Sequence, residues 1–238
     1  VAPLSQARTG PVAISVGKEV VLVSGGVALL PNQAGGNVSD VVDIFSFQGR
    51  TTARLSQPRV DHAVAVLGSR VFFAGGSTVW GNKNQTNSVD IFDLATNSWS
   101  RAALSLPRQD LVAASAGSKV LFAGGFNGSS LSGYSSRVDI YDQNTDSWST
   151  SELSQARYDL AAAVWGSKIF FAGGFSPQGV TAQIDIFDVD TNLWSTAQLS
   201  HPCGLLSGVA INGMVIFAGG ADANGITDVV NIIDASSF

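Results

Sequence analysis

The chain has 238 residues, of which 45% are hydrophobic and only 13% are charged, and its net charge is −5. No basic stretch occurs, which argues against nucleic acid or an anionic membrane surface as the main partner. No apolar run is long enough to cross a bilayer, so membrane insertion is not expected either. Scarce Lys and Glu beside abundant Gly, Ser, Thr and Asn favour an extracellular or cell-surface location. A cytoplasmic location stays open, because Cys203 has no partner for an internal disulfide.

A glycine doublet divides the chain into repeats. The doublets begin at residues 25, 75, 124, 173 and 219, so successive copies lie 50, 49, 49 and 46 residues apart. In the three best copies the doublet ends the apolar stretches RVFFAGG, KVLFAGG and KIFFAGG. A fixed period of this length is typical of repeat architectures. We therefore expect a single domain over 1–238, made of five repeats at about 4–54, 55–103, 104–152, 153–198 and 199–238.

Each repeat is expected to hold four short strands. The first is rich in small residues and is predicted at 12–16, 63–67, 111–115, 160–164 and 207–211. A tight glycine-containing turn joins it to the second strand, which is the apolar stretch before the doublet. The third strand carries VDIF or a variant of it, and the fourth carries Trp99, Trp148 or Trp194. No segment shows a sustained helical period, so helix content should be near zero.

These marks resemble the kelch repeat family, in which a glycine doublet follows the second strand, an aromatic residue lies on the third and a Trp on the fourth. The matching residues are Gly75-Gly76, Phe92 and Trp99; Gly124-Gly125, Tyr141 and Trp148; and Gly173-Gly174, Phe187 and Trp194. The first and fifth repeats depart from the pattern, because neither has the Trp. The resemblance implies an all-β fold, a five-bladed kelch-type β-propeller with four antiparallel strands per blade.

The two ends of the chain are complementary, which predicts how the ring closes. The fifth repeat stops after its third strand, whereas the N-terminal VAPLSQAR aligns with the tail of a fourth strand. We expect residues 1–4 to pair beside 229–233, so that N- and C-terminal strands share one blade. This fastening strand is short, which predicts an exposed edge along 229–233. Such an edge is a template for a strand from another molecule, and assembly into arrays or fibres is the corresponding hypothesis.

Charged residues recur once per repeat. One column consists of Arg8, Arg59, Arg108 and Arg157, and Asp residues form three others. A charge that recurs in every repeat is first explained as architecture, where it caps a turn or pairs across a blade junction. The functional alternative is that the four arginines ring the mouth of a channel and bind a carboxylate or another anion. Cys203 interrupts this column in the fifth repeat.

The connections between second and third strands are the long and irregular ones. They span 27–41, 77–88, 126–137, 175–183 and 221–229. Variable loops on a rigid scaffold are where binding usually resides. These loops carry the aromatic residues Trp80, Phe126, Tyr134 and Phe175, which we expect to form a contact surface for protein or glycan. The alternative is that each ring folds back over its own blade.

Three N-x-S/T sequons lie in the same loops, at Asn37, Asn84 and Asn127. Their number is what chance predicts for this composition, so it carries no weight. Their shared placement is compatible with glycosylation of one face in a secreted eukaryotic protein. We expect all three side chains to be exposed.

No catalytic residue, metal site or cofactor is expected. The chain has no G-x-S-x-G, no phosphate loop and no Cys cluster, and neither His62 nor His201 lies in a metal-like spacing. The sequence therefore predicts a non-enzymatic binding or structural scaffold module whose partners are protein or glycan, or neighbouring copies of itself. Two alternatives stay open: a carbohydrate-active kelch enzyme of the oxidase or isomerase type, and an intracellular kelch substrate adaptor.

Overall fold

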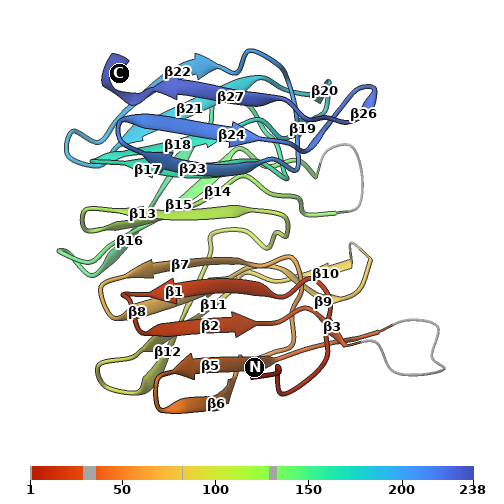
Figure 1. Ribbon diagram of the computed structural model, residues 1–238, viewed down its shortest axis with the longest axis vertical. Helices are drawn as coiled ribbons and strands as arrows, with labels where there is room; N and C mark the ends of the chain where they lie inside the picture. The colour runs from red at the N-terminus through yellow and green to blue at the C-terminus, as the bar shows by residue number, and fades with distance from the viewer. Residues whose placement is uncertain (1, 29–35, 82, 129–132) are drawn as a thin grey trace. The chain divides into compact units, whose positions relative to one another are not determined.

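The computed structural model describes residues 2–28, 36–81, 83–128 and 133–238. The chain divides into two compact units, one of residues 1–109 with 127–129 and the other of residues 110–126 with 130–238. We call them the first unit and the second unit and describe each by itself (Figure 1). The single domain over 1–238 stays a prediction.

The first unit contains two four-stranded antiparallel sheets. The first sheet has the order β1 (Val12–Val16), β2 (Val20–Ser24), β5 (Val41–Ser46) and β6 (Gly49–Arg54). The second sheet has the order β7 (Ala63–Leu67), β8 (Arg70–Ala74), β11 (Ser88–Asp93) and β12 (Ser98–Ala103). Strand β1 lies beside β7, so the first strands of the two repeats, which are rich in small residues, are neighbours.

The second unit contains three further sheets. The third sheet has the order β13 (Val112–Ala116), β14 (Lys119–Ala123), β15 (Arg137–Asp142) and β16 (Ser147–Glu152). The fourth has the order β17 (Ala161–Trp165), β18 (Lys168–Ala172), β21 (Gln183–Asp188) and β22 (Leu193–Gln198). The fifth has the order β23 (Ser207–Ile211), β24 (Met214–Ala218) and β27 (Val230–Asp234). Strand β17 lies between β13 and β23, so the first strands again lie side by side.

The predicted first strands agree with the observed ones to within one residue in every repeat. The Trp residues lie on the fourth strands, as predicted, and each is the direct cross-strand partner of the aromatic residue on the third strand. The ring centroids of Phe92 and Trp99, and those of Phe187 and Trp194, are 4.8 Å apart. The two aromatic residues of each of these repeats therefore form one cross-strand pair, stacked for Phe92 and Trp99 and tilted for Phe187 and Trp194.

Small hairpins, which the sequence did not predict, occupy the connections between second and third strands. They are β3 (Val27–Ala28) with β4 (Asn37–Val38), β9 (Ser77–Val79) with β10 (Lys83–Gln85), β19 (Phe175–Ser176) with β20 (Gly179–Val180), and β25 (Ala221–Asp222) with β26 (Gly225–Ile226). In the third repeat the described residues of this connection form a bridge between Phe126 and Tyr134. Within the described ranges the only helix is the 3₁₀ turn η1 (Ala235–Ser237), and no helix of these residues could span a membrane.

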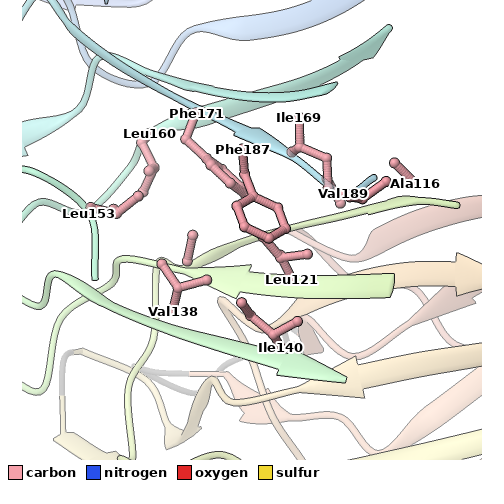
Figure 2. Close-up of a cluster of buried hydrophobic side chains, with 12 residues drawn as sticks. Ala116, Leu121, Val138, Ile140, Leu153, Leu160, Ile169, Phe171, Phe187 and Val189 are labelled. Carbon is pink, nitrogen blue, oxygen red and sulfur yellow. The ribbon is translucent and has the colours of Figure 1, made fainter. Parts of the chain in front are cut away.

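The core lies between successive sheets. Figure 2 shows the junction of the third and fourth sheets, where Phe171 and Phe187 of the fourth sheet point towards Leu121, Val138 and Ile140 of the third. Large rings on one sheet thus meet smaller aliphatic side chains on the other. Consecutive residues of a strand face opposite sides, so the all-apolar second strands are explained by burial on both faces.

The glycine doublets join one repeat to the next. In all five, the first glycine has φ between 61° and 68° and the second between 89° and 107°, where L side chains are strained. The second glycine donates its N–H to a backbone carbonyl of the following repeat, as in Gly125 to Arg157 and Gly174 to Cys203, both at 2.9 Å. A Cβ on Gly174 would lie 2.6 Å from the carbonyl oxygen of Tyr158. The neighbouring backbone segment lies so close, and the backbone of the doublet is so strained for other residues, that only glycine fits at this position.

The recurring arginines are internal to the sheets. Arg59, Arg108 and Arg157 are fully buried. The Arg157 guanidinium lies 2.7 Å from Asp185 on β21 and donates to the carbonyl of Phe171 at 3.0 Å. Arg59 pairs in the same way with Asp90 on β11. Each pair links the segment before a first strand to the second and third strands of its own sheet. Each of these arginines thus pairs with an aspartate of its own sheet. The expectation that the arginines pair across a blade junction is therefore wrong.

The first repeat has the same ion pair in a less enclosed form. Arg8 lies 2.8 Å from Asp43, and the side chains of both are inaccessible to solvent. Burial alone would raise the pKa of the Asp43 carboxyl. Hydrogen bonds from Ser5 and the charge of Arg8 outweigh it, and they hold that pKa below its usual range.

The fifth repeat replaces both members of the pair. Cys203 stands at the arginine position and is buried, and Asn231 stands at the aspartate position. The Asn231 side-chain oxygen accepts from the backbone N–H of Ser200 at 2.8 Å, as Asp185 accepts from Ser154 at 3.0 Å. The hydrogen bond to the backbone is therefore kept, while the buried charge is removed with its partner.

The fifth sheet has three strands among the described residues, where four were expected. Residues 2–8, which belong to the first unit, form no strand. Ile232 of β27 is 63% exposed, whereas its counterpart Ile186 in the fourth sheet is 1% exposed. One face of the fifth sheet and the outer edge of β27 are thus uncovered within the second unit. The closure of a ring by the two termini stays a prediction.

His62 is buried between the first and second sheets, as its place before an inner strand suggested. Its Nε2 lies 2.9 Å from the hydroxyl of Ser24. The later repeats have Leu111 and Leu160 at this position. Burial, with the nearby charge of Arg59 as the smaller cause, lowers the pKa of His62 to about 3. The imidazole is therefore neutral in the folded protein.

We expect Gly174→Ala to destabilise the second unit, because there is no space for the added Cβ. The matched control is Gly179→Ala, because Gly179 has a nearly equal φ of 109° against 104° but open space around it. Both variants carry the backbone strain of about 1–2 kcal/mol. Gly174→Ala should lose about 1–3 kcal/mol more through overpacking. Urea unfolding measures the difference, and equal losses would show that the doublets are not close contacts.

The buried pair predicts a coupled response at Arg157 and Asp185. Arg157→Cys alone leaves a buried carboxylate without its counter-ion, which should cost about 3–5 kcal/mol of unfolding free energy. Arg157→Cys combined with Asp185→Asn copies the fifth repeat and should recover most of that loss. Denaturant unfolding of the two variants provides the comparison. A double variant that is less stable than Arg157→Cys would contradict this account of the fifth repeat.

The neutral imidazole of His62 predicts a pH-dependent loss of stability. The unfolded chain binds a proton near the ordinary pKa of 6.5, whereas the folded chain does so only near about 3. The contribution is complete above pH 6.5 and is lost as the pH falls through this window, at about 1.4 kcal/mol per pH unit. The variant His62→Leu with Ser24→Ala should lack this component, since both residues then match later repeats. Parallel slopes for variant and parent in pH-dependent unfolding would refute the assignment.

Candidate functional site

Four aromatic rings gather in the second unit, at the connections between second and third strands. Phe126, Tyr134, Tyr158 and Phe175 form this aromatic cluster. The Tyr158 centroid lies 5.3 Å from Phe126, 5.4 Å from Tyr134 and 5.6 Å from Phe175. Phe126 and Tyr134 meet edge to face at 5.5 Å. All four residues are only partly buried, so they offer ring surface to solvent. Three of its members, Phe126, Tyr134 and Phe175, are candidates from the sequence, and their use as a contact surface for a partner stays a prediction.

Two backbone bridges hold the cluster in place. Tyr158 and Phe175 exchange two backbone hydrogen bonds, at 3.1 and 2.9 Å, and Phe126 is bridged to Tyr134. Phe175 directly follows the doublet of the fourth repeat, and Tyr158 directly follows Arg157. The third and fourth repeats contribute two rings each. Phe126 and Tyr134 of the third repeat thus contact Tyr158 of the fourth, so these two rings do not pack on their own repeat alone.

A pair of carboxylates borders the cluster. Asp159 follows Tyr158, and its N–H donates to the backbone carbonyl of Asp110 at 3.1 Å. Both residues have left-handed backbone, with φ of 51° and 53°, and both are partly buried. Burial raises the pKa of the Tyr158 phenol, and Tyr134, Asp159 and Asp110 raise it further. Both carboxylates therefore act electrostatically on Tyr158.

The first unit has a related arrangement on a smaller scale. A pocket of about 300 Å³ is lined by Trp80, Asp61, Val60, Thr9 and Gly10. Trp80 is 58% exposed, and Asp61 holds the same repeat position as Asp110 and Asp159. Neighbouring protein atoms raise the pKa of the Asp61 carboxyl above its usual range, although the residue as a whole is exposed. An aromatic ring beside this aspartate position thus occurs in both units.

The other sequence candidates are placed differently. The side chains of Arg8, Arg59, Arg108 and Arg157 are buried, so they do not offer an anion site to solvent, and their placement favours the architectural alternative. Asn37, Asn84 and Asn127 are exposed, as predicted. A larger pocket of about 410 Å³ in the first unit is polar, and its lining includes the Arg54–Asp40 ion pair at 2.6 Å.

One constellation in the fifth repeat has the residue types of a nucleophilic site. His201 Nε2 lies 2.8 Å from a carboxylate oxygen of Asp222, and Cys203 is close in sequence. Burial, with Asp222 as a second cause, raises the pKa of the Cys203 thiol, and the residue is 1% exposed. A nucleophilic cysteine needs a thiolate and access to substrate, and Cys203 has neither. Over the described ranges no three His, Cys, Asp or Glu side chains gather as for a metal ion.

Sequence reasoning missed Tyr158, Asp110 and Asp159. Asp110 and Asp159 belong to a column that recurs in the repeats, and recurrence was interpreted as architecture. Tyr158 lies outside the long loops that were searched for aromatic residues. The available signal was its position: the residue after each arginine is Thr9, Val60, Gln109 or Tyr158, so this position varies beside a residue that recurs in every one of these repeats.

The comparisons with known proteins agree with this architecture. The KLHDC2/KLHL20/DRC7 Kelch-repeats domain model matches residues 62–237. Among solved structures, one described as "Structure of YjhT" is similar with a TM-score of 0.73 and 15% identity, over 95% of this chain and 84% of that one. No curated protein matches the chain. The fold is that of a kelch-type β-propeller, and such propellers are mostly non-enzymatic and generally serve as protein-binding scaffolds. The chain belongs to the Kelch-repeat family.

Proposed function

We propose that this chain is a non-enzymatic binding module that holds a protein segment against the aromatic cluster of the second unit. The observation that carries the proposal is the contact of four partly exposed rings, supplied by two repeats and fixed by backbone bridges. Aromatic residues dominate the energetics of protein interfaces, because they bury a large area at a small entropic cost.

The ring geometry favours a peptide over a glycan. A sugar ring stacks on one flat aromatic face that is open to solvent. Here the rings are tilted against one another, with interplanar angles of 47° and 53° at Tyr158 and 83° between Phe126 and Tyr134. Such a surface has edges and small hollows that suit irregular apolar side chains. A glycan ligand is the alternative outcome of the experiment below.

An extracellular or cell-surface location is part of the proposal. The exposed sequons and the composition support it. Glycans at Asn37 or Asn84 would lie on the loops of the first unit, whereas a glycan at Asn127 would directly follow Phe126 of the cluster in the chain. Intact mass of the natural protein, before and after glycosidase treatment, tests whether the sequons are used.

Self-association is a second candidate, supported by the uncovered face of the fifth sheet. Val209, Ile211, Val230 and Ile232 are each more than half exposed there, and β27 has hydrogen-bonded neighbours on one edge only among the described residues. Apolar faces and free strand edges of this kind attract further chains. A sedimentation experiment in which the protein stays monomeric at high concentration would exclude this candidate.

The proposed site is tested by selecting peptides from a random display library on the immobilised protein, with an oligosaccharide array probed in parallel. We expect peptides whose binding is about tenfold weaker on the variant Tyr134→Ala, since loss of one ring removes a central contact. The matched control is Phe47→Ala, because Phe47 is 88% exposed in the turn between β5 and β6 of the first unit and belongs to none of the loops that carry the cluster. Binding affinities from surface plasmon resonance provide the comparison.

Three results would contradict the proposal. Selected peptides that lose as much affinity on Phe47→Ala as on Tyr134→Ala do not use the aromatic cluster. Binding of oligosaccharides with no selected peptide would replace the protein partner by a glycan. Turnover of an array sugar by the purified chain would replace the binding module by an enzyme.

A further inference from the structure

One carboxylate of the first unit, that of Asp61, has no partner of its own. Residues 1–109 contain five aspartates, and four of them form ion pairs: Asp40 with Arg54, Asp43 with Arg8, Asp90 with Arg59 and Asp93 with Arg70. The side chain of Asp61 makes no hydrogen bond or ion pair with any residue that the structure describes. Neighbouring protein atoms raise the pKa of its carboxyl, and no interaction with the described residues lowers it. Asp61 is therefore an uncompensated negative charge.

Asp61 shares a cavity with an aromatic ring that is also unengaged. We call the cavity of about 300 Å³ in the first unit the Trp80 pocket, and its lining consists of Thr9, Gly10, Val60, Asp61, Trp80 and Gly81. Trp80 is 58% exposed, and over the described ranges its ring contacts no other aromatic ring and no cation. The ring and the carboxylate thus line one cavity, and neither is occupied elsewhere.

Backbone hydrogen bonds hold the two groups at this cavity. Val60, which precedes Asp61, exchanges two backbone hydrogen bonds with Ser77, at 3.0 and 2.8 Å. Ser77 begins β9, and Trp80 lies in the turn directly after that strand. The hairpin that carries the ring is therefore bonded to the segment that carries the carboxylate.

Gly10 leaves space in the pocket. The first repeat has this glycine at the position that Asp61 holds in the second, with a similar left-handed φ of 61° against 56°. A Cβ on Gly10 would have no heavy atom within 4 Å. The space that an aspartate would fill at this position is thus open to a ligand.

An uncompensated carboxylate and an aromatic face favour the same ligand group. Trp attracts a cation through the quadrupole of its ring more strongly than Tyr or Phe does. A carboxylate gains most from a cation that also donates hydrogen bonds, as an ammonium or guanidinium group does. The volume is at the lower end of ligand pockets and suits one such group on an alkyl chain.

We propose that the Trp80 pocket binds an alkylammonium or alkylguanidinium group through the ring of Trp80 and the carboxylate of Asp61. The group belongs to a lysine or arginine side chain of a partner protein or to a free amine, and both sources have this chemistry. The pocket shares no residue with the aromatic cluster, so the inference does not rest on the function proposed for that cluster.

The experiment is a nuclear magnetic resonance titration of the chain, followed by the backbone amide signals of residues 61 and 80. The probes are n-butylammonium and neutral 1-butanol, which have similar size. We expect n-butylammonium to bind about tenfold more tightly than 1-butanol, with an affinity that falls as salt is added. Acetyl-Gly-Lys-Gly-amide distinguishes the sources: tighter binding than n-butylammonium assigns the group to a protein segment, and equal or weaker binding assigns it to a free amine.

Two variants assign the charge, one of them as a matched control. Asp61→Asn removes the charge and keeps a residue type that tolerates left-handed backbone. It should weaken binding of n-butylammonium about five- to tenfold and leave 1-butanol unchanged. Asp146→Asn alters the net charge equally, and Asp146 also has left-handed backbone, with φ of 49°, but it belongs to the second unit and does not line the pocket. Its affinity should stay that of the parent.

A second pair of variants assigns the ring. Trp80→Leu should weaken binding of n-butylammonium about threefold, because the aromatic face is lost. The control is Trp165→Leu, since Trp165 is 39% exposed at the end of β17 and does not line the pocket. Its affinity should equal that of the parent.

Three results would overturn the proposal. Equal affinities for n-butylammonium and 1-butanol would show that the pocket does not select a cation. Equal losses in Asp61→Asn and Asp146→Asn would indicate only a general effect of net charge. Binding of n-butylammonium without a shift of the amide signals of residues 61 and 80 would place the cation outside the pocket. Failure of the peptide selection described above contradicts the function of the aromatic cluster and leaves these results unaffected.

Discussion

The buried arginine–aspartate pair is the interaction on which each full repeat depends. It carries two charges into an interior where an isolated charge would be strongly unfavourable, so each member needs the other. The guanidinium of Arg157 also donates to the end of the second strand. It thereby fixes the segment before the first strand against two other strands of the sheet. The backbone carbonyl of Arg157 is then in position to accept the N–H of Gly125, which belongs to the preceding repeat.

Several residues of the candidate site directly follow the buried arginine or the glycine doublet in the chain. Arg157 is followed by Tyr158 and Asp159, and the doublet Gly173-Gly174 is followed by Phe175. Once the arginine and the doublet are in place, the bridge between Tyr158 and Phe175 follows with little freedom. The residues at these positions differ between repeats, whereas the arginine and the doublet recur. The repeat therefore combines a recurring internal frame with adjacent positions that vary.

Periodic features were predictable from the sequence, and the site was predictable only in part. The doublets, the Ala-rich first strands and the Trp marks recur at fixed spacing, and each repeats one local physical requirement. The aromatic residues of the long loops were predictable, because binding residues usually lie in variable loops. Tyr158 was not, since its proximity to Phe126 depends on how two repeats pack, which no spacing along the chain reveals. The role of the arginines could not be decided from the sequence either, because only the structure shows that their side chains are buried.

The fifth repeat shows where the aromatic cluster ends and why. At the position of Tyr158 it has Gly204, and a Cβ there would lie 2.5 Å from the ring of Phe175. The glycine thus makes room for a ring that the fourth repeat supplies. The next residue, Leu205, takes the left-handed position that Asp occupies in the three preceding repeats, with φ of 57°. A leucine there has no polar side chain to compensate the strain and adds no charge. The fifth repeat has therefore lost the internal ion pair and the surface carboxylate together, so both the frame and the charged surface stop at the fourth repeat, with Phe175 as the last ring.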